Sequence, residues 1–130
     1  MSKLSTIQKR KNLNDVYSVD APGAGGASHV YVIVKSGAAV NQDGAVLDLA
    51  DIVGKIVFQH GPRKDASSTH GVLDVDLLEI VRDRLKAFNQ GEFATRENAL
   101  AITHIEEALL WLNKRVEDRA ERGVLGTTNK

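Results

Sequence analysis

The sequence predicts an α+β protein in which a small N-terminal antiparallel β-sheet precedes a C-terminal antiparallel helical hairpin. Two observations lead to this fold class. Residues 29–35 (HVYVIVK) and 55–59 (KIVFQ) are short β-branched and aromatic runs that end near turn residues, as strands do. From residue 73 onward, apolar residues recur every three or four positions in two stretches separated by a glycine, which is typical of amphipathic helices.

The first 28 residues predict an arm. They are mostly polar and end in the small, backbone-permissive stretch APGAGGAS at 21–28, which suits a linker. Such an arm is partly flexible unless a partner chain holds it. The basic tract Lys9-Arg10-Lys11 is interpreted as part of a solvated terminus in preference to a nucleic-acid-binding arm, because a short charge run is usually a solvated one.

Residues 29–72 predict the small β-sheet portion. The run at 29–35 is the best strand of the chain, and Asp43-Gly44 can supply the positive φ angles of a tight hairpin turn. Residues 45–49 predict a second strand, although the longer stretch AVLDLADIVG at 45–54 could instead form one helical turn. The run at 55–59 predicts a further strand, which ends at a Gly-Pro turn before a polar loop.

Residues 73–123 predict two helices. Asp74 can cap the first, which runs to about Asn89 before a glycine interrupts the pattern. Thr95 can cap the second, and Gly123 is suited to its C-terminal end. The short connection between them favours an antiparallel hairpin.

The second helix carries a stripe of apolar residues, and residues 124–130 follow it as a fraying tail. Two helices and about three strands bury little surface for a chain of 130 residues, so we expect oligomerisation to complete the core. The predicted buried stripe comprises Ala101, Ile105, Ala108, Leu109, Leu112 and Val116.

The charge balance argues against polyanionic partners. Lys+Arg and Asp+Glu both number 17, whereas binding to DNA or an anionic membrane draws on a net basic surface. No apolar run approaches the roughly 18 residues of a membrane span, and no apolar segment follows the basic start as in a secretory signal. The chain has no cysteine, which fits a reducing cytoplasm.

The sequence predicts neither a metal site nor an enzyme. His60, His70 and His104 lack the spacing of zinc ligands. No nucleophile stands in a recognisable catalytic motif, and the carboxylates at the start of the first helix are better explained by capping. The GAGG at 23–26 precedes a strand instead of following one, so it is not a dinucleotide-binding fingerprint. We expect no cofactor.

The residues that favour a ligand are cationic and aromatic. Arg63 and Lys64 emerge together after a predicted strand, where Arg suits phosphate oxygens and Lys adds a point charge. Aromatic rings offer faces on which a base can stack. On these residues alone, a nucleotide site and an ordinary solvated loop both stay open. For Trp111, packing in the core or an interface is the favoured interpretation. The candidate rings are Phe58, Phe88, Phe93 and Trp111.

Two segments resemble a family of small phage proteins. FQHGP at 58–62 and the stretch LLEIVRDRLKAFNQGEFATRENALAITHIEEALLWLNKRVEDRAERGVLGT at 77–127 are similar to that family's strand end and two helices. The second helix also resembles that of the phage anti-CBASS protein two, and the version with a β-rich N-terminal part looks like the Thoeris anti-defence protein one. The resemblance covers a little over half of the chain.

This resemblance implies a function. Such proteins are sponges that bind cyclic nucleotide immune signals without cleaving them, in the cytoplasm of the infected bacterium, so that Thoeris or CBASS effectors are not activated. It implies glycocyclic ADP-ribose as ligand, with cyclic di- and trinucleotides as further candidates. It also implies a homo-oligomer, typically a hexamer, with ligands held between protomers.

The resemblance further implies four ligand-binding residues: Phe88, Asn98, Arg115 and Arg63. Arg115 follows Asn98 by 17 residues, which is about 25 Å along a helix, so one protomer could not place both on one small ligand. A partner protomer would have to bring the two residues together. The alternative is a structural or assembly protein that uses the hairpin only to oligomerise.

Overall fold

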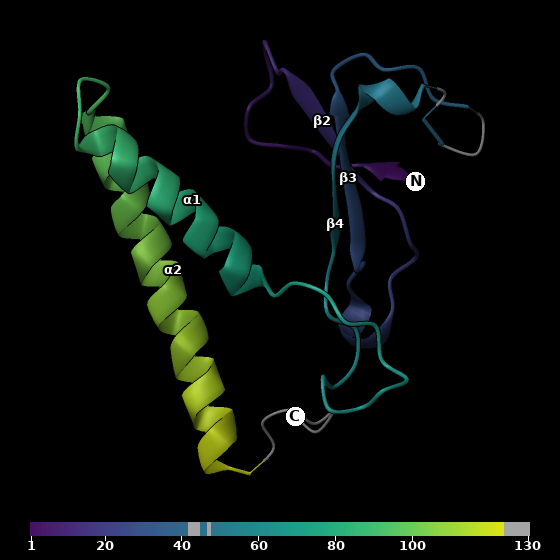
Figure 1. Cartoon of the computed structure of the whole chain (residues 1–130), viewed down its shortest axis with the longest axis vertical. Coiled ribbons are helices and arrows are strands. Elements are labelled where there is room, and N and C mark those ends of the chain that lie inside the picture. The colour runs from purple at the N-terminus through teal and green to yellow at the C-terminus, as the bar shows by residue number, and fades with distance from the viewer. Residues whose placement is uncertain (42–44, 47, 124–130) are drawn as a thin grey trace. The chain divides into compact units, whose positions relative to one another are not determined.

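The computed structural model of the chain describes residues 1–41, 45–46 and 48–123. The chain divides into two compact units, Met1–His60 and Gly61–Lys130. The first is a sheet and the second contains two helices (Figure 1). Sheet and helices thus follow one another along the chain, as the predicted fold class requires.

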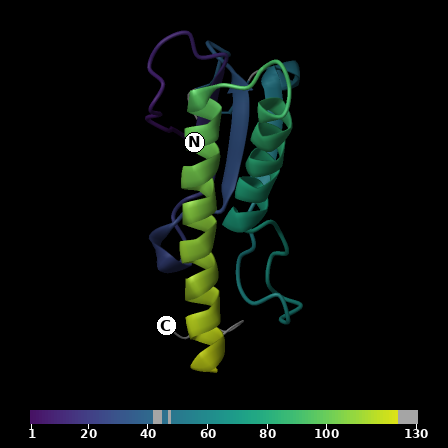
Figure 2. The same cartoon turned by 90° about the vertical axis from the view of Figure 1, so that its left-hand side faces the viewer.

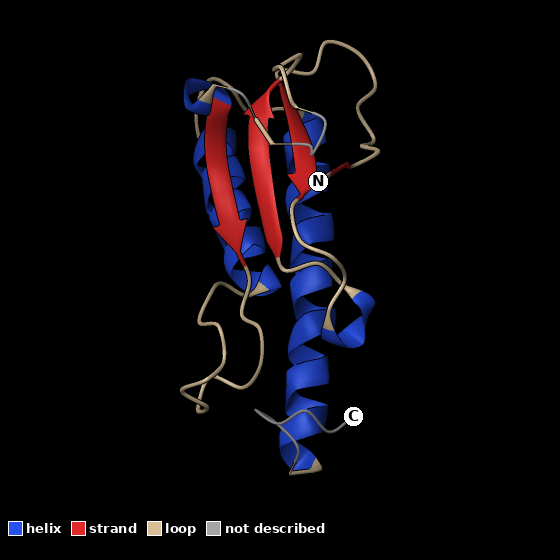
Figure 3. Cartoon of the chain, turned by 90° about the vertical axis from the view of Figure 1, so that its right-hand side faces the viewer, coloured by secondary structure: helices blue, strands red, loops and turns tan. Residues whose placement is uncertain are grey.

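The sheet unit is a four-stranded antiparallel meander with the order β1-β2-β3-β4. Each strand pairs with its neighbour in sequence (Figure 3). The strands are β1 (Ser2–Lys3), β2 (Asn14–Ser18), β3 (Val30–Lys35) and β4 (Ile52–Val57). Antiparallel neighbours can be joined by short local connections, so the sheet needs no crossover helix.

The centre of the sheet is β3, whose sequence VYVIVK combines β-branched side chains with one aromatic. Val32 and Val34, two residues apart, lie on one face of the strand and are 8% and 1% exposed. They are the buried apolar side chains of the described residues. The register shifts between Ile33 and Val34 on the β4 side, where Val34 faces Ile52.

The prediction of an arm over residues 1–28 is wrong for β1 and β2, which are paired strands of the sheet. Val16 of β2 pairs with Ile33 of β3, so this segment is part of the sheet. The sequence NDVYS has little strand propensity of its own, and pairing with a strong neighbouring strand overrides it. The buried carboxylate of Asp15 is held by Lys3 Nζ at 3.5 Å and by the Ser36 hydroxyl at 3.2 Å.

The connection between β2 and β3 is also ordered by hydrogen bonds. Asp20 accepts from the backbone N–H of Val30 at 2.9 Å and of His29 at 3.0 Å. These backbone donors lower the pKa of Asp20 from its ordinary value, that of Val30 most strongly. The hydroxyl of Ser28 donates to the Asp20 carbonyl at 2.9 Å. The small residues at 21–28 therefore form a closed loop instead of an open linker.

The described residues of 45–49 form no strand, so that prediction is wrong for them, and the alternative of a helical turn within 45–54 is confirmed. Val46 makes a single bridge with Val40, and a 3₁₀ turn follows at Leu49–Asp51. Asp48 caps this turn by accepting from the Ala50 N–H at 2.9 Å. An aspartate just before the turn favours the cap over strand pairing. The hairpin turn expected at Asp43-Gly44 lies outside the described residues.

The two predicted helices are confirmed as α1 (Asp74–Asn89) and α2 (Arg96–Glu121), which lie side by side and run antiparallel (Figures 1 and 2). Arg82 Nε of α1 donates to Glu106 Oε2 of α2 at 2.7 Å. This bond raises the pKa of Arg82.

The helix ends follow ordinary capping, with one correction. Asp74 lies inside α1 and does not cap it; the carboxylate of Asp76 instead accepts from the Leu73 N–H at 2.8 Å. Thr95 caps α2 as predicted, because its hydroxyl accepts from the Asn98 N–H at 3.0 Å. Gly123 follows α2 with a φ of 72°, which favours glycine.

The hairpin lacks a buried core of its own. Neither α1 nor α2, both fully described, contains a buried residue. The stripe predicted to be buried on α2 is only half-buried, and Val116 at its end is exposed. Leu110 and Trp111 are 69% and 70% exposed. Two helices bury only the seam between them, so the rest of each apolar stripe stays in solvent.

Candidate functional site at the closed end of the helical hairpin

Two of the predicted ligand-binding residues lie at the closed end of the hairpin. Phe88 is in the last turn of α1, and Asn98 is in the first turn of α2. The turn between them is held by Asn89, whose side-chain oxygen accepts from the Thr95 N–H at 3.0 Å. The Asn98 amide donates to the Phe93 carbonyl at 3.4 Å. Local hydrogen bonds therefore preorganise the segment that carries both residues.

Phe88 is 43% exposed, and a cation lies over its ring. The guanidinium carbon of Arg84 lies 5.4 Å from the ring centroid, within the range of a cation–π contact. Arg84 was not among the predicted site residues. The signal that could have found it is its spacing, since residues four apart on a helix are neighbours.

Arg115 lies elsewhere on the hairpin. It is exposed on α2, 17 residues after Asn98, or about 25 Å away at 1.5 Å per residue. The structure therefore does not bring Arg115 to Asn98 within one chain. The separation of Asn98 and Arg115 agrees with the one predicted from the sequence, because both residues lie in the same helix.

Arg63 belongs to the loop that leads into α1. Its Nη2 donates to the Gly71 carbonyl at 2.7 Å, which closes the loop. Asp65 accepts from the N–H and hydroxyl of Ser67 at 2.9 and 2.8 Å, and these bonds lower its pKa. The 16 residues of α1, about 24 Å of helix, separate this loop from the end that carries Phe88.

Grooves run between the helices, away from the closed end. One has a volume of about 340 Å³ and joins Val75 near the start of α1 to the later turns of α2. A second, of about 420 Å³, adjoins the Arg82–Glu106 pair. The lining of the first is mostly apolar, which suits a helix or another apolar surface better than an anion. Its residues are Val75, Glu79, Leu109, Leu110, Leu112, Asn113 and Val116.

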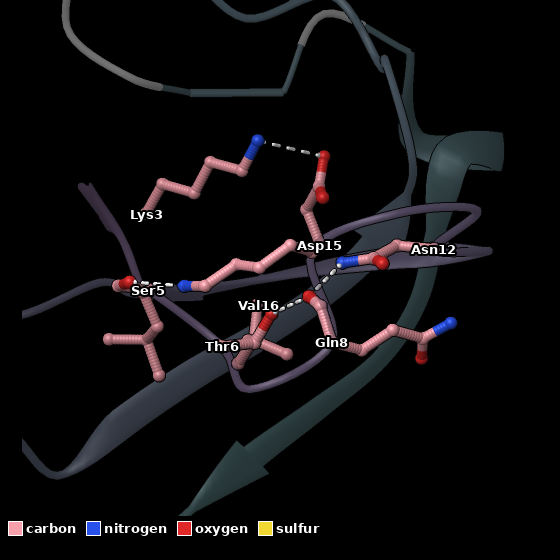
Figure 4. A pocket seen from close by; sticks show the side chains of 9 residues that line it. Lys3, Ser5, Thr6, Gln8, Asn12, Asp15 and Val16 are labelled. Atoms are coloured by element: carbon pink, nitrogen blue, oxygen red, sulfur yellow. Dashed lines mark hydrogen bonds and ion pairs between the residues drawn. The ribbon is translucent and has the colours of Figure 1, made fainter.

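The sheet unit has a polar cavity of about 220 Å³ between β1 and β2 (Figure 4). Its polar groups mostly bind one another. Lys9 Nζ donates to the Ser5 hydroxyl at 2.7 Å, and the Asn12 amide donates to the Gln8 carbonyl at 3.0 Å. All of its lining residues come from the first 16 of the chain, and none is a predicted site residue. These contacts organise the β1–β2 connection.

The histidines do not gather into a metal site. Within the described residues, no group of three His, Asp or Glu side chains could hold a metal ion. His60 stacks on His29 with ring centroids 4.0 Å apart and 11° between planes. His104 lies 3.9 Å from Glu107 on the same helix. Among the described helices, none is both long and apolar enough to cross a bilayer.

Comparison with known proteins finds a family that is defined by such a hairpin. The family described as "Acb2/Tad1, hairpin domain" matches residues 50–117, a little over half of the chain. The chain belongs to the Acb2/Tad1 hairpin family. The match covers α1 and most of α2, so this family assignment includes Phe88, Asn98 and Arg115 within its bounds.

A curated relative agrees with the family. The chain is 47% identical over 85 residues to "Thoeris anti-defense 1" of Bacillus phage SBSphiJ7. The aligned region is 65% of this chain and 59% of that relative. The chain therefore spans about three fifths of the relative that it matches, and the name describes that phage protein.

Proposed function

We propose that this protein is a phage anti-defence sponge that binds cyclic nucleotide immune signals in the host cytoplasm and does not cleave them. Sequestration would keep Thoeris or CBASS effectors inactive. The observation that carries the proposal is the closed end of an Acb2/Tad1 hairpin, where an exposed aromatic ring and an amide flank one ordered turn. Glycocyclic ADP-ribose is the first proposed ligand, with cyclic di- and trinucleotides as further ones.

The four proposed site residues divide three tasks among them. The Phe88 ring stacks on adenine, because its exposed face is flat and apolar. Asn98 binds a polar edge of the ligand through its side-chain amide. Arg115 and Arg63 neutralise phosphate oxygens, which a guanidinium can bind through two parallel N–H groups.

The distances make assembly part of the proposal. Arg115 is about 25 Å along α2 from Asn98, so an antiparallel second protomer would supply it. The exposed Leu110 and Trp111 and the apolar inter-helix groove support such an assembly, since burial of this surface would complete the hairpin core. We propose a homo-oligomer, with a hexamer as its form.

Sequestration without cleavage sets an affinity requirement. A sponge acts stoichiometrically and must bind its signal more tightly than the effector does, which implies nanomolar affinity or about 12 kcal/mol. A cyclic ligand suits this requirement, because its ring closure has already removed much of the conformational freedom that binding would restrict.

Calorimetry with glycocyclic ADP-ribose, followed by chromatography of the ligand released on heating, tests the proposal. We expect nanomolar binding and intact ligand. Phe88→Ala should weaken binding by about 5- to 150-fold, because stacking of a base is worth about 1–3 kcal/mol. Phe93→Ala is the matched control, since it removes an exposed ring from the adjoining turn. No heat with glycocyclic ADP-ribose or cyclic oligonucleotides, or recovery of a cleaved ligand, would refute the proposal.

The second candidate is an assembly protein that uses the hairpin only to oligomerise. The exposed Leu110 and Trp111 favour it, because assembly alone would account for them. Phe88→Ala separates the two functions. A sponge loses its ligand while the oligomer remains, whereas in an assembly protein the oligomer is the property that changes.

A further inference from the structure

The contact between Arg84 and Phe88 carries an inference that rests on the proposed function. Both residues are on α1, four positions apart, so their side chains are neighbours on the helix surface. The guanidinium carbon lies 5.4 Å from the ring centroid. A positive charge and an aromatic ring therefore lie next to each other at the closed end of the hairpin.

The contact with the ring leaves the donors of Arg84 available. A guanidinium carries five N–H groups, and its attraction to a ring face does not require a hydrogen bond from them. Within residues 1–41, 45–46 and 48–123, Arg84 makes no hydrogen bond or ion pair to the protein. Arg82, two positions earlier, is by contrast bonded to Glu106 at 2.7 Å and lies 3.5 Å from Glu79.

We propose that Arg84 is a further ligand-binding residue, which donates N–H groups to the phosphate oxygens of a nucleotide whose base stacks on Phe88. The ligand class is a phosphate-bearing purine nucleotide. This role deepens the proposed function, because one protomer then supplies a ring for the base and a cation for the phosphate. Arg63 and Arg115 cannot do so, since each is about 24–25 Å of helix away from the closed end.

The test is calorimetric titration of glycocyclic ADP-ribose into the wild-type protein and four variants, one of which is Phe88→Ala. Arg84→Ala should raise the Kd by about tenfold or more, the loss expected for hydrogen bonds to a charged group. Arg84→Met keeps an unbranched apolar chain beside Phe88 without the charge, and should weaken binding as much as Arg84→Ala. Lys86→Ala removes the same charge from an exposed position on α1 and should stay within about twofold.

Salt adds a second readout that a purely structural role would not change. Raising NaCl from about 50 to about 300 mM should weaken ligand binding by wild type more than ligand binding by Arg84→Met. Salt screens the ion pair between Arg84 and the phosphate, and the variant lacks this pair. Circular dichroism and size-exclusion chromatography would confirm that each variant keeps its fold and assembly.

The outcomes separate this inference from the proposed function. If wild type binds, Phe88→Ala loses the ligand and Arg84→Met binds like wild type, the role of Arg84 is refuted and the sponge stands. The same holds if Lys86→Ala weakens binding as much as Arg84→Ala, because net charge would then explain the loss. If wild type binds no cyclic nucleotide, both the proposed function and the inference fail.

Discussion

The sheet unit and the hairpin unit differ in whether they bury side chains of their own. The sheet buries Val32 and Val34 on β3 and surrounds the buried Asp15 with Lys3 and a serine hydroxyl. The hairpin has longer elements, yet neither of its helices contains a buried residue. Both units expose large apolar side chains, among them Ile7 and Leu13 in the sheet unit, but of the described residues only those of the sheet unit include buried apolar ones.

This difference bears on the proposed assembly of the hairpin. Exposed apolar side chains on a helix are unfavourable in water, so their exposure along α2 supports the proposed assembly, which would bury them. The family match at residues 50–117 covers that same hairpin. The match also includes β4, so relatives share part of the sheet as well as the hairpin.

The largest expected effect comes from a charge placed on the hairpin surface. If assembly covers this surface, Leu110→Asp should convert the oligomer to monomer, because an unpaired carboxylate would be buried in the interface. Size-exclusion chromatography with light scattering would measure the mass. His104→Asp is the control, since it puts the same charge at an exposed site on the same helix. An oligomer that survives Leu110→Asp would argue that Leu110 lies outside the interface.

A smaller effect is expected from the core of the sheet. Val34→Ala should lower the free energy of unfolding by about 2 kcal/mol, because it deletes two methyl groups at a fully buried position. Val53→Ala makes the same change on β4, where the side chain is 56% exposed, and should cost less than about 0.5 kcal/mol. Urea denaturation would measure both. Equal losses would show that the sheet has no distinct core.

Removal of the cap of α2 should have an effect of about half that size. Thr95→Ala leaves the Asn98 N–H without its acceptor and should destabilise the hairpin by about 1 kcal/mol. Thr103→Ala, in the interior of the same helix, should have little effect, because alanine is the better helix former there. Thermal denaturation followed at the helical circular dichroism band would distinguish them. Similar losses from both changes would contradict the capping role.

The smallest effect concerns pH and the loop between β2 and β3. The pKa of Asp20 is lower in the folded protein than its ordinary value of 3.8, because backbone N–H groups of Val30 and His29 bind the carboxylate. Its contribution to stability is therefore fully present above pH 3.8 and is lost as the pH falls through the lower folded-state value. Asp20→Asn should be less stable than wild type at neutral pH, with the difference shrinking in acid. A difference independent of pH would rule out the carboxylate as its source.

The success of sequence reasoning varied with how local the structural cause was. The two helices followed from apolar periodicity and from the Thr95 cap, both of which act within one or two turns. The same locality brought Phe88 and Asn98 together, since a short turn joins their helix ends. β2 was missed because its five residues become a strand only through pairing with β3. Arg84 was missed although its four-residue spacing from Phe88 is visible in the sequence.

The sequence by itself determined the α+β class, the family and both helices, because helical periodicity, caps and family motifs are properties of neighbouring residues. Only the tertiary structure decided the number of strands, the helical turn at Leu49–Asp51 and the solvent exposure of the hairpin's apolar side chains. Strand pairing and burial depend on residues far apart in the chain. A short sequence segment does not specify which distant residues it will contact, and these contacts are set only when the chain folds.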